Sequence, residues 1–178
     1  MKREQLEHLI RAAGDVSRSR RLIVVGSQAI LGQHPHDAPA RATLSREADL
    51  IPIDALDAAD AISGALGELS AFDESFGYHA DGVGLETAVL PSGWEDRLVA
   101  IDNANTNGYV GLCLELHDLM LSKYFAGRDK DHEFCRAVVE AALADRETLL
   151  ERLAQMPITP ADRERIERRI GDDFVSRN

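Results

Sequence analysis

A short β-branched run that ends at a glycine constrains what this chain can fold into more than any other feature. Leu22 to Val25 is apolar and is followed at once by Gly26 and Ser27, which open a short helical segment. The run predicts a buried central strand. Glycine permits a sharp turn and close approach of a ligand to the backbone, and amides at a helix start can bind phosphate. The same pair also occurs as an ordinary helix cap, so both interpretations stay open.

Two carboxylates two residues apart follow a polar loop at residues 33–45. If this segment is a strand, Glu47 and Asp49 project from the same face. Neighbouring carboxylates repel unless a cation lies between them, and their hard oxygens select Mg²⁺ or Mn²⁺. If Gly26 and Ser27 end an adjacent strand, both features lie at one edge of a sheet and suit metal-dependent phosphate chemistry. The alternative is a pair of solvated acids on an edge strand.

Opposite charges also occupy inward positions on two consecutive expected helices. Lys123 falls in the middle of an apolar stripe formed by Leu112, Leu116, Leu119 and Met120. A lysine there must reach solvent or find an anion, because an unpaired buried ammonium is costly. Asp131 lies on the apolar face of the next helix, so the two residues either pair structurally or serve one site. Arg128 and Lys130, at the turn between the helices, could contact phosphates or cap the preceding helix.

The remaining pattern predicts the order of the elements. Helices are expected at residues 3–13, 27–31 and 56–69, strands at 22–25 and 47–53, and an antiparallel meander at 76–102. Everything after Gly108 is expected to be helical, with helices at 112–126, 132–144 and 147–156 and a fourth that starts at Thr159 and Pro160. The expected fold class is α/β (α+β), with a mixed-sheet core at residues 1–108 and a C-terminal helical bundle at residues 109–178.

Charge and length restrict the classes of partner. The chain has 178 residues, enough for one compact domain, and its net charge of −11 disfavours non-specific binding to nucleic acid. An RNA substrate would therefore need a local basic surface, such as Arg18, Arg20 and Arg21, or a basic partner. No apolar run approaches the roughly 20 residues that a membrane helix needs, and the charged N-terminus does not resemble a signal peptide. We expect a cytoplasmic protein with no membrane partner.

These motifs, taken in order, resemble those of a known superfamily. Gly26-Ser27 followed by Ser45-Arg46-Glu47-Ala48-Asp49-Leu50 is similar to the signature of nucleotidyltransferases with the DNA polymerase β-like fold. The later segments Leu116 to Leu119, Ser122-Lys123 and Arg128 to Asp131 resemble the helical motif of minimal nucleotidyltransferases related to the AbiEii-like toxins of type IV toxin–antitoxin pairs. The segment Leu90 to Val99 also looks typical of one uncharacterised bacterial branch of that group. The resemblance covers roughly residues 20 to 140.

The resemblance implies transfer of a nucleoside monophosphate from a nucleoside triphosphate to an acceptor. It implies a catalytic role for Glu47 and Asp49 as ligands of Mg²⁺ or Mn²⁺, which would bridge the phosphates and activate the acceptor hydroxyl. Toxins of this kind add nucleotides to the acceptor end of tRNA, so tRNA and a cognate antitoxin become possible partners. The remaining residues implied at the site are Gly26 and Ser27 on the triphosphate, Lys123 and Asp131 in catalysis, and Arg128 and Lys130 on the nucleotide.

Two departures from the family pattern leave alternatives open. Glu47 stands where aspartate is usual, and a longer side chain shifts a ligand oxygen in a geometry on which Mg²⁺ makes strict demands. The third carboxylate, expected on a following strand, is not fixed by the sequence, and its candidates are Asp81, Glu86, Asp96 and Asp102. A non-catalytic nucleotide-binding or interaction domain is therefore a second hypothesis. A third is a small-molecule nucleotidyltransferase, whose cationic substrate would suit the acidic chain.

Overall fold

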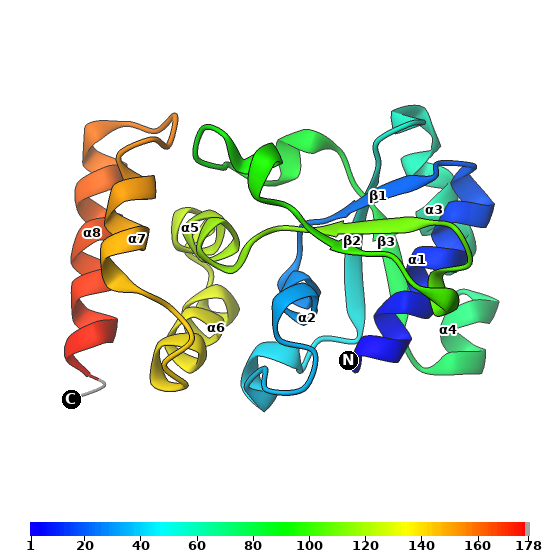
Figure 1. The fold of residues 1–178 in the computed structure, drawn as a ribbon, viewed down its shortest axis with the longest axis horizontal. Coiled ribbons are helices and arrows are strands. Elements are labelled where there is room, and N and C mark those ends of the chain that lie inside the picture. The colour runs from blue at the N-terminus through cyan, green and yellow to red at the C-terminus, as the bar shows by residue number, and fades with distance from the viewer. Residues whose placement is uncertain (177–178) are drawn as a thin grey trace.

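Five strands form one mixed sheet in a computed structural model that describes residues 1–176 (Figure 1). The strand order is β3-β2-β1-β5-β4. Strand β1 pairs antiparallel with β2 and parallel with β5, β2 pairs parallel with β3, and β4 pairs antiparallel with β5. The strands are β1 (Arg21–Val24), β2 (Glu47–Pro52), β3 (His79–Gly82), β4 (Val99–Ile101) and β5 (Val110–Cys113).

Helices flank this sheet, and the C-terminal helices continue outward on one side of it (Figure 1). One face is packed by α1 (Arg3–Ser17) and α3 (Ala59–Leu66), with α4 (Ala71–Phe76) beside them. The short helix α2 (Ile30–Gln33) contacts α1, β4 and β5. On the side away from α3 and α4 lie α5 (Leu116–Ala126) and α6 (Asp129–Glu140), and beyond them α7 (Arg146–Leu153) and α8 (Pro160–Val175). The expected fold class, a mixed sheet with flanking helices and a C-terminal helical bundle, is confirmed.

Burial explains why β1 is the central strand. Leu22, Ile23 and Val24 are all buried, although successive residues of a strand project from opposite faces of the sheet. A β-branched or apolar residue at every position suits a strand of this kind, whereas an edge strand needs a polar face. The sequence prediction of a buried strand at this position is therefore confirmed. Its C-terminal end meets Gly26 and the short 3₁₀ turn η1 (Ser27–Ala29), which continues into α2.

Two predictions about the second half of the chain are wrong. The antiparallel meander at residues 76–102 does not form, because β3 pairs parallel with β2 and the chain then runs irregularly from Val83 to Leu98 with two 3₁₀ turns, η4 (Leu85–Thr87) and η5 (Trp94–Arg97). The segment after Gly108 is not entirely helical, because residues 110–113 form β5. The helix expected from residue 112 therefore begins only at Leu116.

The C-terminal helices follow their sequence signals. Thr159 caps α8, since its hydroxyl accepts a hydrogen bond from the Asp162 backbone N–H at 3.1 Å, and Pro160 occupies the first turn as predicted. The division of the chain at residue 108 stays a prediction, with the qualification that β5 follows this position and yet lies inside the sheet. Over the described part of the chain, none of the helices combines the length and the apolar character that crossing a membrane requires.

Candidate functional site

The Gly26–Ser27 turn lies directly against Asp49. The Val25 backbone N–H donates a hydrogen bond to the Asp49 carbonyl at 3.1 Å, which joins the end of β1 to the middle of β2. The backbone of Gly26 comes so close to the Asp49 carboxylate that a Cβ atom at residue 26 would overlap Oδ2. A side chain here would displace the carboxylate. The Gly26–Ser27 turn and the Glu47–Asp49 segment, more than twenty residues apart in sequence, therefore lie together. They meet where the C-terminal end of β1 lies beside β2, as the sequence pattern predicted.

Strand register brings a third carboxylate to this site. Glu47 and Asp49 lie on one face of β2, while Ala48 and Leu50, which alternate with them, are buried on the other. In the parallel pair of β2 and β3, Asp49 is the register partner of Asp81. Register partners in neighbouring strands project from the same face. Asp81 is thus the structural candidate for the third carboxylate that the sequence left open.

The competing candidates lie outside this pair of strands. Glu86 belongs to η4, Asp96 belongs to η5, and Asp102 follows the opposite edge strand β4. All three side chains are exposed. None of the three is a register partner of Glu47 or Asp49 in the sheet.

The surroundings of Glu47 and Asp49 disfavour the state in which both carboxylates are ionised. Burial raises the pKa of Glu47, and the negative charge of Asp49 and a hydrogen-bonding contact with Asp81 raise it further. Burial also raises the pKa of Asp49, with Asp81 adding to the increase and Lys123 opposing it. A bound divalent cation would relieve the repulsion between partly buried carboxylates such as these. Within residues 1–176, however, no three His, Cys, Asp or Glu side chains already surround one metal position.

A basic wall faces the carboxylates from α5 and α6. Lys123 is buried, with Nζ 3.2 Å from Asp131 Oδ1 and 4.7 Å from the centre of the Phe134 ring. Arg128 Nε donates to the other oxygen, Oδ2, at 2.6 Å. Burial opposes ionisation of Asp131, but the hydrogen bonds and charges of Arg128 and Lys123 keep its pKa below the usual range. Asp131 is fully buried, so it orients the two cations and does not itself face the cavity.

These elements surround a cavity of about 640 Å³. Its lining brings together most of the residues that the sequence singled out, from four separate segments of the chain. Its charged and turn residues include Gly26, Ser27, Arg41, Glu47, Asp49, Lys123, Arg128 and Lys130. Asp81 does not line this cavity and lies on its β3 side. A cavity with a glycine turn, carboxylates and a basic wall suits a phosphate-bearing ligand that carries a divalent cation.

Sequence reasoning missed the residue that fixes the distance between the turn and the carboxylates. Gln28 is fully buried and its Nε2 donates to the Ser45 carbonyl at 3.0 Å. The Ser45 hydroxyl in turn accepts from the Glu47 backbone N–H at 3.1 Å. A chain of hydrogen bonds thus links η1 to the start of β2. The one sequence signal for this role of Gln28 was its place directly after the Gly-Ser pair. A glutamine in that place is not specific enough to predict such a role.

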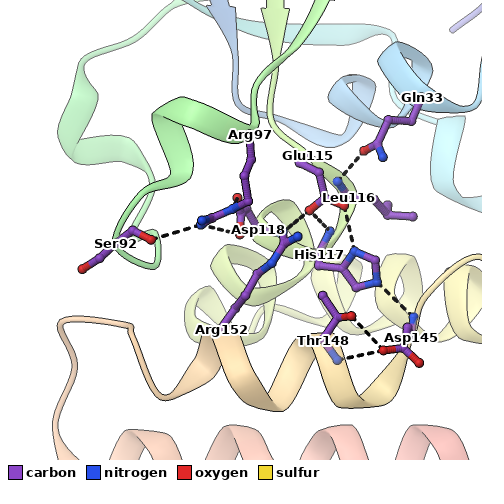
Figure 2. Close-up of polar contacts among 10 residues, drawn as sticks. All are labelled: Gln33, Ser92, Arg97, Glu115, Leu116, His117, Asp118, Asp145, Thr148 and Arg152. Atoms are coloured by element: carbon purple, nitrogen blue, oxygen red, sulfur yellow. Dashed lines mark hydrogen bonds and ion pairs between the residues drawn. The ribbon is translucent and has the colours of Figure 1, made fainter.

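A second missed feature is the polar network that fixes α5 in place (Figure 2). Asp118 is fully buried and accepts from Arg97 Nε at 2.8 Å and from Arg152 Nη1 at 3.0 Å. Glu115 caps the N-terminus of α5 and pairs with Arg152 and with His117 Nδ1. Burial opposes its ionisation, but His117 and Arg152 lower the pKa of Glu115 to about 2. The network joins α5, which carries Lys123, to the irregular segment before β4 and to α7.

The fold and the site together define a class of protein. A mixed sheet that presents a glycine-serine turn beside carboxylates on adjacent strands, opposite a basic helical wall, is compatible with a nucleotidyltransferase-like fold. A family model described as "Nucleotidyltransferase of unknown function (DUF6036)" matches residues 4–170. The chain therefore belongs to this family. Comparisons with curated proteins and with solved structures gave no significant match.

Proposed function

We propose that this protein is a metal-dependent nucleotidyltransferase that moves a nucleoside monophosphate from a nucleoside triphosphate to an acceptor hydroxyl. The observation that carries the proposal is the contact of the Gly26–Ser27 turn with Asp49 in the lining of one cavity, with Asp81, the register partner of Asp49, beside it. Membership of a nucleotidyltransferase family supports the general activity. Metal dependence, the acceptor and the biological role are proposals.

The residues at this edge fit a hard divalent cation. Glu47, Asp49 and Asp81 offer only oxygen ligands, which Mg²⁺ and Mn²⁺ prefer. Burial raises the pKa values of Glu47 and Asp49, and the mutual repulsion of the carboxylates raises them further, although Lys123 and Lys130 oppose this increase. When bound, such a cation would neutralise the phosphate oxygens and lower the pKa of the acceptor hydroxyl. The carboxylates would adjust their side-chain rotamers around it.

The remaining residues of the cavity bind and orient the substrate. The backbone amides around Gly26 and the Ser27 hydroxyl would donate to phosphate oxygens, and Gly26 leaves room for both the phosphate and Asp49. Lys123, Arg128 and Lys130 would stabilise the negative charge that moves onto the leaving pyrophosphate. Asp131 keeps Lys123 and Arg128 oriented before the substrate arrives. Positioning and charge stabilisation account for most of the catalysis in this chemistry.

For the acceptor we propose tRNA or another RNA end, in the manner of a toxin from a toxin–antitoxin pair. The resemblance of Ser122-Lys123 and of Arg128 to Asp131 to the AbiEii-like motif supports this choice. It implies a cognate antitoxin and a cytoplasmic location. The competing hypotheses, a non-catalytic nucleotide-binding domain and a small-molecule nucleotidyltransferase, predict different products from the same protein.

A transfer assay separates these hypotheses. The protein is incubated with Mg²⁺, total tRNA and each of the four α-labelled nucleoside triphosphates in turn. We expect label in tRNA with at least one nucleotide, and none with the Asp49→Ala variant. Nucleotide-dependent thermal stabilisation with no labelled product from any acceptor would support the non-catalytic domain, and label on small cationic acceptors but not on RNA would support the third hypothesis. Labelling that survives Asp49→Ala would contradict the metal role of Asp49.

A further inference from the structure

The carboxylate cluster has a second side, away from the nucleotide cavity. The cavity is lined by residues at the end of β1, by residues between 41 and 49 that include the start of β2, by residues 87–88, and by α5 and α6. Neither Asp81 nor His79 on β3 contributes to its lining. Strand β3 is the edge of the sheet, so within the described residues no further strand closes this side. A reactant could therefore approach the carboxylates from β3 without entering the cavity that the nucleotide would fill.

A buried acidic residue on α4 organises this side. Asp73 has a side chain only 8% exposed, and its Oδ2 accepts from the Leu69 backbone N–H at 3.2 Å. Its Oδ1 lies 3.3 Å from His79 Nδ1, and His79 is the register partner of Glu47. The same Oδ1 lies 3.5 Å from Nη2 of Arg46. The Arg46 carbonyl also accepts from the His79 backbone N–H at 2.9 Å, so Arg46 contacts β3 through its backbone and α4 through its side chain.

Arg46 differs from Arg128 and Arg97 in how tightly it is paired. Arg128 and Arg97 each donate to a buried carboxylate at 2.6–2.8 Å. Arg46 has a side chain 59% exposed, and the 3.5 Å contact with Asp73 is its one ion pair within residues 1–176. Asp73 therefore orients the Arg46 guanidinium without using up its hydrogen bonds. An oriented arginine with free donors is suited to bind phosphate through two parallel hydrogen bonds.

The direction of the proposed reaction gives this arginine a role. In phosphoryl-transfer chemistry the attacking and leaving oxygens lie roughly in line. The pyrophosphate would leave toward Lys123 and Arg128, on the α5 and α6 side, so the acceptor would attack from the β3 side. We propose that Arg46, oriented by Asp73, binds a phosphate group of the acceptor, and that the acceptor is a nucleic-acid 3′ end. This inference rests on the proposed nucleotidyl transfer.

The chemistry of Arg46 distinguishes between acceptor classes. A nucleic-acid chain carries a phosphodiester next to the nucleotide that bears the attacking 3′-hydroxyl, so a phosphate lies close to the reacting group. A cationic small molecule would instead be repelled by Arg46. The net charge of −11 makes a local arginine more important for holding RNA, because the rest of the surface repels it.

The test compares Arg46→Gln and Arg46→Lys with the wild type, using a short single-stranded RNA with a free 3′-hydroxyl. We expect Arg46→Gln to raise the KM for this RNA and its Kd in fluorescence anisotropy by roughly tenfold, with Arg46→Lys in between because it keeps the charge but loses the planar fork. The salt dependence, the slope of log Kd against log salt, should fall by about 0.7 for one lost phosphate contact. Stabilisation by the Mg²⁺-bound triphosphate should not change.

The matched control is Arg168→Gln, at an exposed arginine on α8, away from the sheet. Equal losses from Arg168→Gln would show that only overall charge matters and would overturn the inference, as would an unchanged Kd for Arg46→Gln. Failure of the proposed function gives a different result. In that case the wild type transfers no label to any acceptor, while the anisotropy measurement still reports whether Arg46 binds the RNA.

Discussion

Gly26 and Asp49 lie so close together that the position of the Asp49 carboxylate requires residue 26 to have no side chain. A Cβ atom at Gly26 would overlap Asp49 Oδ2, although the φ of Gly26 is −81° and would suit any residue. The requirement for glycine is thus one of space and not of backbone conformation. The contact joins the turn that we propose to bind phosphate to the carboxylate pair. A change of one methyl group at Gly26 therefore tests the proposed chemistry.

The substitution Gly26→Ala should abolish binding of Mg²⁺-bound nucleoside triphosphate while leaving the protein folded. The added methyl group would push the Asp49 carboxylate away from its position, at a cost of about 1–3 kcal/mol typical of overpacking. Gly64→Ala on α3 is the control, because Gly64 is exposed and a Cβ there would meet nothing within 4 Å. That change should raise the free energy of unfolding by about 0.5–1 kcal/mol and leave nucleotide binding unchanged. Normal nucleotide affinity in Gly26→Ala would contradict the account.

Asp81→Asn should weaken binding of Mg²⁺ or Mn²⁺ by at least about tenfold, as measured by isothermal titration calorimetry in the presence of a non-hydrolysable triphosphate. The expectation follows from the register of Asp81 with Asp49, since removing one carboxylate removes a charged ligand. Glu86→Gln is the matched comparison, because Glu86 lies in η4, outside the strand pair, and should bind metal as the wild type does. The reverse pattern would show that the third carboxylate comes from the irregular segment.

Asp49→Asn should stabilise the metal-free protein at neutral pH. Burial raises the pKa of Asp49, so the folded state binds the proton more tightly than the unfolded chain. The free energy of unfolding therefore falls as pH rises from the ordinary value of 3.8 through the raised one, and the charged form is a net cost above that window. The variant avoids this cost, and each kcal/mol gained raises Tm by about 2–4 °C.

Thermal unfolding in a chelator, at pH 7 and again at a pH below the ordinary pKa of Asp49, measures this effect. The gain from Asp49→Asn should be present at pH 7 and disappear at the lower pH, where the wild-type carboxyl is also neutral. Asp102→Asn, at an exposed carboxylate after β4, should change stability by less than about 0.5 kcal/mol at either pH. A loss of stability in Asp49→Asn at pH 7 would argue against the burial of that charge.

Asp131→Asn should destabilise the protein more than Lys123→Met. Removing the carboxylate leaves the buried Lys123 ammonium without its partner, a change that costs about 3 kcal/mol or more. Removing the lysine leaves Asp131 still paired with Arg128 at 2.6 Å, and a methionine can replace the buried stem. Urea unfolding of both variants gives the comparison. Equal losses would mean that Arg128 does not compensate the Asp131 charge.

Local features of the sequence were enough to predict the central strand before Gly26 and the shared face of Glu47 and Asp49 in the candidate site. The β-branched run before Gly26 specifies a central strand because every position is buried, and the two-residue spacing of Glu47 and Asp49 places both on one face of any strand. The Thr159 cap is local in the same way, since its hydrogen bond spans only three residues. Such predictions hold because they depend on neighbours along the chain.

The remaining features of the candidate site depend on pairing between distant segments of the chain. Asp81 joins the site only through the register of β2 with β3, which no local pattern determines. Strand β5 is short and leads almost directly into α5, so its apolar residues merged with the helical pattern and the helix start was placed too early. The contacts of Asp118 with Arg97 and Arg152 span 21 and 34 residues, and they form only after the irregular segment and α7 pack on α5.

The central claim is that the turn, the carboxylates and the basic wall bind one Mg²⁺-nucleotide complex. A crystal structure with Mg²⁺ and a non-hydrolysable nucleoside triphosphate tests it most directly. The account predicts the triphosphate between the Gly26–Ser27 turn and Lys123, with the cation in contact with Asp49 and Asp81. A nucleotide bound outside the cavity, or a cation held by phosphates without these carboxylates, would contradict it.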